Sequence, residues 1–394
     1  MSTGTHTLVR ATDSDWDAIV VGAGPGGALA SRQLALAGLR TLLVERHVFP
    51  RNKVCGGCLN GRALETLHAV GLESAFEALR PVELSRFVLQ ANRRRVELDL
   101  PAGAAIQRSS FDAMLVQAAI DAGVEFLPET RALVEDDGRA DLAVRRVQLR
   151  QHGGAARMAK ARVIVAADGL GHPSLQHIPA FACRVDPASR IGIGATVAKA
   201  GSGYCSNTIY MALANWGYVG LVRTSDDSWN LAAAFDPKAL RLATSPAALV
   251  ADTLRTAGLP QLTSLNACVW HGTPPLTRQS ARLAIPRLFL LGDAAGYREP
   301  FTGEGMGWAL SSAIAVVPAV LQSVADESEL AAAHWNEAQR HQLQRGQAIC
   351  RIVSGVLRRP ALVGAGVHAL SVLPSLANPL VRRIHARPLK VIHP

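Results

Sequence analysis

Glu45, Asp168 and Asp293 each stand at the end of a short apolar run, or one residue beyond it. Such runs are typical of strands that are buried on both faces of a parallel sheet. A carboxylate in the position of Glu45 can accept hydrogen bonds from both hydroxyl groups of a ribose. The chemistry that Glu45 indicates is therefore nucleotide binding, and the other two acids repeat its place after a strand.

A glycine-rich turn precedes Glu45 and carries the spacing G-x-G-x-x-G at Gly22, Gly24 and Gly27. Gly22 permits the tight turn, Gly24 lets the backbone approach a pyrophosphate, and Gly27 lets helix and strand pack closely. Backbone N–H groups at the start of the following helix then hold the phosphate charge. Because Glu45 lies 18 residues after Gly27, the turn and the acid together predict a dinucleotide site. A turn without a ligand would leave Glu45 unexplained.

These residues need regular elements to position them. The sequence predicts a strand at 18–21, a helix that stops at Gly38, and a second strand at 41–44. Two further buried strands are expected at 163–167 and 288–291, each running into an acid beside a glycine. The order of these elements predicts an α/β fold built on a parallel sheet.

The character of the sequence changes between residues 191 and 270. Four strand-like runs are joined by short polar turns: 191–198, 208–213, 218–222 and 230–235. Alternating residues in 87–100 also predict a hairpin. We expect a separate antiparallel sheet that is inserted into the nucleotide fold.

Composition limits the kinds of partner. The chain has 394 residues, which allows two or three domains, or one fold with a large insertion. Its net charge of +10 would suit nucleic acid, but the arginines are scattered, and aromatic residues (5%) are too few for a base-stacking platform. We expect no nucleic-acid partner, and a basic surface that attracts anionic cofactors or membranes. Residues 1–15 contain no apolar signal core, so the expected compartment is the cytoplasm.

Cys55 and Cys58 form a C-x-x-C with two glycines between them. Zinc would need two more ligands, and the sequence has no second C-x-x-C and no H-x-x-x-H, so we expect no metal. Two interpretations stay open: a redox-active dithiol, and a structural loop whose glycines let it lie flat against a planar ligand. The loop that faces a cofactor is the favoured interpretation.

The segment 299–307 leads into a long helix that is expected to reach about Val317. Glycines at 303, 305 and 307 remove side chains from the place where this helix begins. Backbone N–H groups there can approach a flat ring or hold an anionic oxygen. Glu304 has two interpretations, an acid beside the ring and a carboxylate at the start of the helix.

The turn 22–27 with Glu45, and the dipeptides 168–169 and 292–293, together resemble a known nucleotide fold. This is the glutathione-reductase-type FAD-binding Rossmann fold, which is shared by the aromatic hydroxylases (class A flavin monooxygenases) and the geranylgeranyl reductases. The resemblance covers roughly residues 17–320, with the motifs in the family's order.

Two loops favour the geranylgeranyl reductase branch. Residues 53–57 are similar to its K-x-C-G-G loop, and residues 300–305 are similar to its P-x-T-G-E-G loop. Residues 216–220 stand where that branch carries an aromatic-rich strand lining the substrate cavity, although the usual F-P pair is absent. The hydroxylase D-G motif continues into an arginine, and residues 168–174 contain none.

The resemblance implies a division of the chain into an FAD-binding domain, a substrate domain with an inserted antiparallel β-sheet, and C-terminal helices. The expected boundaries are 15–80, 101–180 and 276–345 for the FAD-binding domain, 81–100 (a hairpin) and 181–275 for the substrate domain, and 346–394 for the C-terminal helices.

The resemblance also implies site residues. Those expected to bind the cofactor are Gly22, Gly24, Pro25, Gly26, Gly27, Glu45, Arg46, Arg108, Asp168, Gly292, Asp293, Gly303, Gly305 and Met306. Those expected to be catalytic are Cys55, Gly303 and Glu304, and those expected to line the substrate pocket are Trp216, Tyr218, Pro300 and Phe301.

The implied function is that of an FAD-dependent oxidoreductase acting on an apolar small molecule. The favoured reaction is reduction of a C=C bond, as in the geranylgeranyl reductases. The alternative is an FAD-dependent monooxygenase of an aromatic or polyketide-like substrate, and a lesser alternative is an electron-transfer flavoprotein. The sequence has no second nucleotide fingerprint, so we expect NADPH to bind transiently or a protein donor to supply electrons. The sequence carries no signal for the oligomeric state.

No residue between 361 and 380 is charged, and paired arginines flank this stretch at 358–359 and 382–383. Its length fits a transmembrane span, which is one interpretation. Pro374 should break it into two short helices, and a span would have to satisfy its polar groups in lipid. We expect helical pieces that pack on the substrate domain and cover its cavity, with basic ends that touch a membrane surface.

Overall fold

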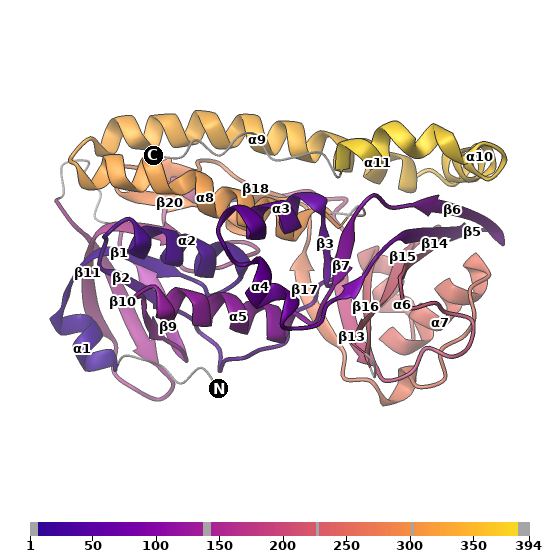
Figure 1. Cartoon of the computed structure of the whole chain (residues 1–394), viewed down its shortest axis with the longest axis horizontal. Helices are drawn as coiled ribbons and strands as arrows, with labels where there is room; N and C mark the ends of the chain where they lie inside the picture. Colours follow the sequence, from indigo (N-terminus) through magenta and orange to yellow (C-terminus); the bar gives the residue numbers. More distant parts are fainter. Residues whose placement is uncertain (1–6, 137–142, 226–227, 300, 302, 385–394) are drawn as a thin grey trace.

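The computed structural model describes residues 7–136, 143–225, 228–299, 301 and 303–384. Figure 1 shows two bodies side by side, with the long helix α9 (Ser328–Leu357) running along the top of the view from the first body towards the second. The first body is built on an eight-stranded sheet and the second on a seven-stranded sheet.

The first body confirms the predicted α/β pattern. Its main sheet has the order β19-β20-β11-β1-β2-β8, and its pairs from β20 to β8 are parallel. These strands are β1 (Asp15–Val21), β2 (Thr41–Val44), β8 (Glu125–Leu127), β11 (Arg157–Ala166), β19 (Ala284–Ile285) and β20 (Leu288–Leu290), and β9 (Thr130–Val134) and β10 (Arg145–Gln151) join through β11. Ile19, Val20 and Val165 are fully buried, which is why the apolar runs do not alternate with polar residues.

Helices pack around this sheet and carry the loops of the site. They are α1 (Leu8–Asp13), α2 (Pro25–Leu36), α3 (Gly61–Ala69), α4 (Glu73–Glu77), α5 (Arg108–Asp121) and α8 (Gly305–Val324). α2 packs against both α5 and α8, so the two helices whose starts were expected to face a cofactor lie together.

The glycine turn sets the distance between β1 and α2. A Cβ atom on Gly27 would lie 1.9 Å from the carbonyl oxygen of Gly22. At Gly22 φ is +102°, and a Cβ atom would lie 2.6 Å from the carbonyl oxygen of Ala167. Neither position can accept a side chain, so the turn holds the start of α2 tightly against β1 and β11.

The second body contains the predicted inserted sheet, in the order β17-β13-β16-β15-β14-β5-β6. Its strands are β5 (Arg86–Ala91), β6 (Arg94–Asp99), β13 (Ile191–Val197), β14 (Thr208–Ala214), β15 (Gly217–Ser225), β16 (Ser228–Phe235) and β17 (His271–Pro275). Each of the four predicted runs forms a strand, and the hairpin predicted in 87–100 is β5 and β6. α7 (Pro246–Ala257) packs against this sheet, with α6 (Pro237–Leu242) beside it.

The inserted sheet is antiparallel, as expected, except at one pair of strands. β5 and β14 pair in parallel, with Val88 opposite Tyr210. β5 belongs to a chain segment that precedes β14 by more than a hundred residues, so no tight turn fixes their relative direction. The β5–β6 hairpin therefore extends a sheet that a later part of the chain completes.

Two small three-stranded sheets complete the fold. One contains β3 (Cys58–Asn60), β7 (Gly103–Ala105) and β4 (Val82–Glu83), and the other contains β12 (Cys183–Val185), β18 (Arg278–Ser280) and β21 (Gly296–Tyr297).

The C-terminal segment is broken at Pro374, as the sequence predicts. α10 (Pro360–Val372) is followed by a 3-10 turn (Pro374–Ala377) and by α11 (Asn378–Ile384). α10 packs on β5 and β6 at the end of the second body (Figure 1), which confirms the expected packing on the substrate sheet.

Among the described residues, two segments have the length and apolar composition that a membrane-spanning helix requires. The first is α8, which is long and apolar enough to cross a membrane. The second is α10 together with Pro374–Arg382, which reach the required length only as a pair and are bent by 119° where they join. α8 contributes Leu310, Ala313 and Val316 to the main hydrophobic core, as a core helix of a globular protein does.

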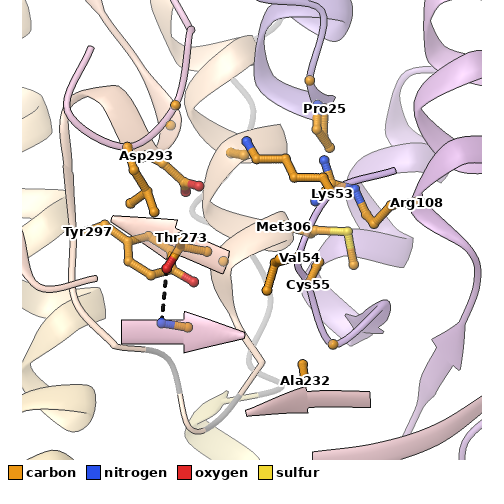
Figure 2. Close-up of a pocket in the computed structure, with 18 of the residues that line it drawn as sticks. Pro25, Lys53, Val54, Cys55, Arg108, Ala232, Thr273, Asp293, Tyr297 and Met306 are labelled. Atoms are coloured by element: carbon orange, nitrogen blue, oxygen red, sulfur yellow. Dashed lines mark hydrogen bonds between the residues drawn. The ribbon is translucent and has the colours of Figure 1, made fainter. Parts of the chain in front are cut away.

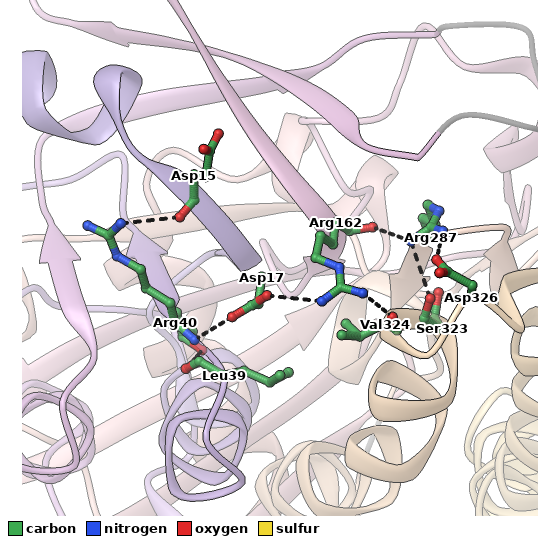
Figure 3. Close-up of polar contacts among 10 residues, drawn as sticks. Asp15, Asp17, Leu39, Arg40, Arg162, Arg287, Ser323, Val324 and Asp326 are labelled. Carbon is green, nitrogen blue, oxygen red and sulfur yellow. Dashed lines mark hydrogen bonds and ion pairs between the residues drawn. The ribbon is translucent and has the colours of Figure 1, made fainter.

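Polar contacts join the far end of α8 to the strands (Figure 3). Asp17 on β1 accepts a hydrogen bond from the backbone N–H of Arg40 at 2.9 Å and pairs with Arg162 at 3.4 Å. Arg162 also donates to the carbonyl oxygen of Val324, the last residue of α8. Arg287 donates to the carbonyl oxygen of Ser323 at 3.2 Å, so two arginines satisfy carbonyl groups that the helix end leaves unpaired.

We predict that Gly27→Ala destabilises the protein even without a ligand, because its methyl group would overlap the Gly22 carbonyl. The expected loss is roughly 1–3 kcal/mol, as for other overpacked sites, read as a lower midpoint of thermal unfolding. Gly24→Ala is the matched control, since a Cβ atom there would lie 3.7 Å from its nearest neighbour. Equal stability of the two variants would contradict the argument.

Candidate active site

One large cavity joins the two bodies. Its volume is about 940 Å³, near the upper end of the roughly 300–1,000 Å³ range of ligand pockets. It is lined by predicted residues from distant parts of the chain: Gly22, Gly24, Pro25, Gly26, Glu45, Arg46, Cys55, Arg108, Asp168, Tyr218, Gly292, Asp293, Phe301, Gly303, Gly305 and Met306. The structure therefore brings most of the predicted site together.

The start of α2 forms one end of the cavity. Gly24 caps this helix and Pro25 is its first residue. A side chain at Gly24 would point into open space beside the Arg51 guanidinium, whereas Gly27 packs under the turn and does not line the cavity. The exposed N–H groups of the helix start thus face a space in which an anion can bind.

Glu45 is buried beside this turn, and three contacts hold its carboxylate in place. It accepts hydrogen bonds from the backbone N–H groups of Ala23 and His47, both at 3.1 Å, and pairs with Arg51 at 3.2 Å. Burial alone would raise the pKa of Glu45, but the Arg51 cation and these hydrogen bonds outweigh it and lower the pKa below its ordinary value. Glu45 is therefore ionised, the state in which it can accept hydrogen bonds from ribose hydroxyls.

A cationic group lies in the middle of the cavity. Arg108 binds Asp112 through two hydrogen bonds of 2.9 Å, and Arg51 pairs with the same carboxylate at 3.2 Å. Figure 2 shows Lys53 extended between Arg108 on one side and Asp293 on the other. The Lys53 side chain is exposed, but to the space of the cavity, whose walls enclose it. This enclosure lowers the pKa of Lys53, although Asp293 opposes the effect. Three cations close together can neutralise a diphosphate.

Asp168 and Asp293 approach the cavity from the ends of β11 and β20. Burial raises the pKa of both carboxyl groups, and Lys53 and Arg108 partly oppose this at Asp293. Asp168 accepts a hydrogen bond from the N–H of Ser174 at 2.8 Å through one oxygen, and its other oxygen is buried without a hydrogen-bond partner. An acceptor of this kind is suited to a hydroxyl group of a bound ligand.

Cys55 and Cys58 face the cavity as thiols that are not joined by a disulfide. Cys55 lies within hydrogen-bonding reach of Arg108 and accepts from the N–H of Gly57 at 3.4 Å. Burial and the neighbouring Cys55 raise the pKa of Cys58 to about 12, so this thiol stays protonated at neutral pH. The described residues contain no group of three His, Cys, Asp or Glu side chains placed to hold a metal ion.

The start of α8 packs beside the start of α2 and also borders the cavity. Gly303 has φ of +73° and Gly305 opens the helix, and both line the cavity with Met306. Glu304 does not: its side chain is buried and accepts from the Cys350 thiol on α9 at 3.7 Å. Glu304 is the N-cap residue of α8, so its carboxylate stands at the start of the helix, although its side chain makes no hydrogen bond that caps the helix. The other interpretation, an acid beside the ring, differs from its observed place outside the cavity lining.

A mainly apolar lobe of the cavity lies against the seven-stranded sheet. Phe87 and Tyr218 contact Phe301 edge-on, with ring centroids 6.3 and 5.1 Å apart. Trp216 is not part of this wall: its indole N–H donates to Thr253 on α7 at 2.9 Å. Pro300 lies outside the described residues.

The C-terminal helices cover this apolar lobe, as the sequence predicts. Leu370 on α10, Ala377 in the 3-10 turn, and Leu380 and Val381 on α11 all line the cavity. Val353 near the end of α9 also lines it. The lobe is therefore bounded by the sheet on one side and by the last helices on the other.

A buried polar cluster behind Tyr218 was not predicted from the sequence. Arg190, 1% exposed, pairs with Glu299 and Asp236, each at 3.1 Å, and Arg358 approaches Glu299 at 3.6 Å. Burial and the negative charge of Glu299 raise the pKa of Tyr218 well above its ordinary value. Arg51 and Lys53 were also missed as site residues. Arg51 belongs to no recognisable motif, and Lys53 opens the K-x-C-G-G loop, of which only Cys55 was expected in the site.

The chain belongs to the FAD binding domain family, which it matches over residues 15–345. It therefore carries an FAD-binding domain and is related to oxidoreductases. A digeranylgeranylglycerophospholipid reductase of Methanopyrus kandleri is 33% identical over 159 residues, which cover 40% of this chain and 38% of that protein. Another such reductase, of Methanosphaera stadtmanae, is 25% identical over 75% of each chain. The first match thus spans well under two thirds of the relative.

A solved flavin-dependent brominase, Bmp2, has the same fold, with a TM-score of 0.78 and 94% of each chain covered at 19% identity. This agreement confirms the predicted glutathione-reductase-type architecture.

The observed residues fit FAD. Gly24 leaves room for a diphosphate at the start of α2, and three cations face that space. The free oxygen of Asp168 and the ionised Glu45 can accept from hydroxyl groups at two places along the ligand. Glu45 would hold the adenosine ribose, Arg51, Lys53 and Arg108 the diphosphate, and the backbone at 303–306 the flavin edge.

We predict that Gly24→Val folds but does not retain FAD, because the side chain would occupy the diphosphate position. Glu45→Ala should weaken FAD by roughly 1.5–3 kcal/mol, since it removes a charge-assisted acceptor but leaves the phosphate site. Flavin content of the purified proteins and titration of the apoproteins measure both effects. Full FAD occupancy in Gly24→Val would show that the ligand lies elsewhere.

We predict that Cys55→Ser slows reoxidation of the reduced flavin by substrate several-fold while FAD stays bound. Cys58→Ser should have a mild effect, because its thiol keeps its proton and borders Gly56 and Gly303 rather than Arg108. Stopped-flow absorbance measures the rate of flavin reoxidation in each variant, and thiol titration measures whether Cys55 and Cys58 are oxidised. Equal damage from both variants, together with an oxidised pair in the native protein, would favour the dithiol interpretation instead.

Proposed function

We propose that the protein reduces a C=C bond of an apolar small molecule. The observation that carries this proposal is the continuous cavity, which begins at the G-x-G-x-x-G turn and ends in an apolar lobe beside Tyr218 and Phe301. The names of the two reductases to which the chain is similar support the same reaction type. Bound and reduced FAD would supply the hydride.

The apolar lobe would bind and orient the substrate. Leu89, Ile209 and Met211 on the sheet and Leu370 on α10 offer only apolar side-chain atoms, so a hydrocarbon chain loses no hydrogen bond on entering. The cover of α10 and α11 would exclude water from the reacting carbon atoms. Exclusion of water strengthens the electrostatic interactions inside the site.

Reduction of a C=C bond also needs a proton at the second carbon atom. Tyr218 and Tyr297 line the cavity, and burial raises the pKa of both hydroxyl groups well above the ordinary value. Negative charge nearby adds to this effect, from Glu299 at Tyr218 and from Asp293 at Tyr297. Both hydroxyl groups therefore keep their protons at neutral pH and are the donors that this chain offers inside the lobe.

A monooxygenase is the second candidate, with an aromatic or polyketide-like substrate. The same enclosed lobe would shelter oxygen chemistry from water, and the fold is shared with a flavin-dependent brominase. An electron-transfer flavoprotein is a third candidate and would need no substrate lobe. For the reductant we propose NADPH that binds transiently, or a protein donor.

We predict that the anaerobically reduced protein is reoxidised by an isoprenoid with isolated C=C bonds. The product should gain two hydrogen atoms per flavin, and the absorbance of oxidised flavin should return at the same rate. Mass spectrometry of the product and stopped-flow absorbance measure the two quantities, with FAD-free Gly24→Val as the control.

Three results would contradict this reaction. Reoxidation that requires oxygen and adds an oxygen atom to the substrate would indicate a monooxygenase. Reoxidation only by a partner protein, with the substrate unchanged, would indicate electron transfer. Anaerobic reduction of substrate by the FAD-free control would show that the reduction does not need FAD in the nucleotide site.

A further inference from the structure

The last helices leave large apolar side chains in solvent. Leu362 on α10 is 44% exposed, Val372 71%, Leu373 51%, Leu376 57% and Leu380 38%. We call these five residues the C-terminal apolar face. Single exposed apolar residues are ordinary, but a group in three successive short elements marks an interaction site.

The charged residues around this face are all basic. Glu337 is the last acidic residue of the chain, and the 57 residues that follow contain nine arginines and lysines. Arg351, Arg359 and Arg382 are exposed before and after the apolar helices. A fitting partner is therefore apolar where the face is apolar and anionic at its edge. A bilayer that contains anionic lipids has both properties.

A second copy of the chain fits this face less well. In a twofold dimer the same surface meets itself, so the arginines of one copy would approach those of the other. The described part of the segment after Glu337 offers no carboxylate to separate them. Like charges brought together in this way oppose association.

The face also continues into the cavity. Leu380 is part of the face and lines the apolar lobe, and Leu370 and Val381 line the lobe from the same helices. An apolar molecule could thus pass between the two without crossing water. α10 and the following segment bend by 119° and bury Val367 and Ala377 against the protein, which is the geometry of helices that lie along a surface rather than cross it.

We propose that the C-terminal apolar face docks on the surface of a bilayer containing anionic lipids, with the apolar lobe opening towards that bilayer. Leu373 and Leu376 enter the boundary between head groups and acyl chains, and Arg359 and Arg382 bind the anionic head groups. This interaction goes beyond the reaction proposed above. Because it is measured without turnover, it can hold or fail independently of that reaction.

The test is flotation of the full chain with phosphatidylcholine vesicles, with and without phosphatidylglycerol. The native protein should float with the anionic vesicles and be released by high salt. Leu373→Glu with Leu376→Glu should weaken binding by at least about tenfold, because two leucines that would enter the bilayer become charges. Leu242→Glu with Val269→Glu is the matched control, since those side chains are 74% and 73% exposed elsewhere, and it should float like the native protein.

The arginines are tested separately. Arg359→Gln and Arg382→Gln should each weaken binding to anionic vesicles about fivefold at low salt, the equivalent of about 1 kcal/mol per basic residue near such a surface. Flavin content confirms that every variant is folded.

Several results would overturn the proposal. They are a native protein that floats with neither vesicle, a leucine double variant that floats as well as the native protein, and release only by detergent, which would indicate a span. A dimer that this double variant disrupts, without flotation of the native protein, would assign the face to a second copy.

Discussion

The site depends on a balance of buried charges at the carboxyl edge of the parallel sheet. Arg51 joins the carboxylates of Glu45 and Asp112, Arg108 binds Asp112 through two hydrogen bonds, and Lys53 faces Asp293. Removing one partner of such a group leaves a buried charge uncompensated, at a typical cost of about 3–5 kcal/mol. A diphosphate can enter because the cations are already assembled, and ribose hydroxyls can bind because the acids are assembled beside them.

The loop 53–58 connects this charged edge to the second body. Asn230 on β16 donates to the carbonyl oxygen of Cys55, and a Cβ atom at Gly194 on β13 would lie 3.2 Å from Val54. The loop that carries Lys53 and Cys55 is therefore held by the sheet that forms the apolar lobe. The two ends of the cavity are fixed relative to one another through this loop, which is what a reaction between a cofactor and a substrate from different bodies requires.

The parts of the fold with local signals were predictable. Apolar runs gave β1, β2, β11 and β20, because a strand buried on both faces needs apolar residues throughout. The turn 22–27 was predictable because Gly22 and Gly27 have no room for a side chain. The break at Pro374 followed from the missing N–H of proline. Each of these properties belongs to a few consecutive residues.

The parts set by distant contacts were not predictable. Nothing near β5 specifies that it pairs in parallel with β14, and nothing near Arg51 specifies that it reaches Asp112. Trp216 shows how a local rule fails: it is two residues before Tyr218, so strand alternation would put both on one face. It lies instead in the turn of the β14–β15 hairpin, where alternation no longer holds, and it packs on α7.

The buried cluster around Glu299 ties the cover of the lobe to the cofactor end. Glu299 precedes the segment that leads to Gly303, and it binds Arg190 at the start of β13 and Arg358 at the end of α9. Its second oxygen has no hydrogen-bond partner, so the charge of Arg358 is what compensates it there. If the C-terminal helices moved away with Arg358, that oxygen would be left in the interior with less compensation. The position of the helices that close the lobe is therefore coupled energetically to the segment that leads to Gly303.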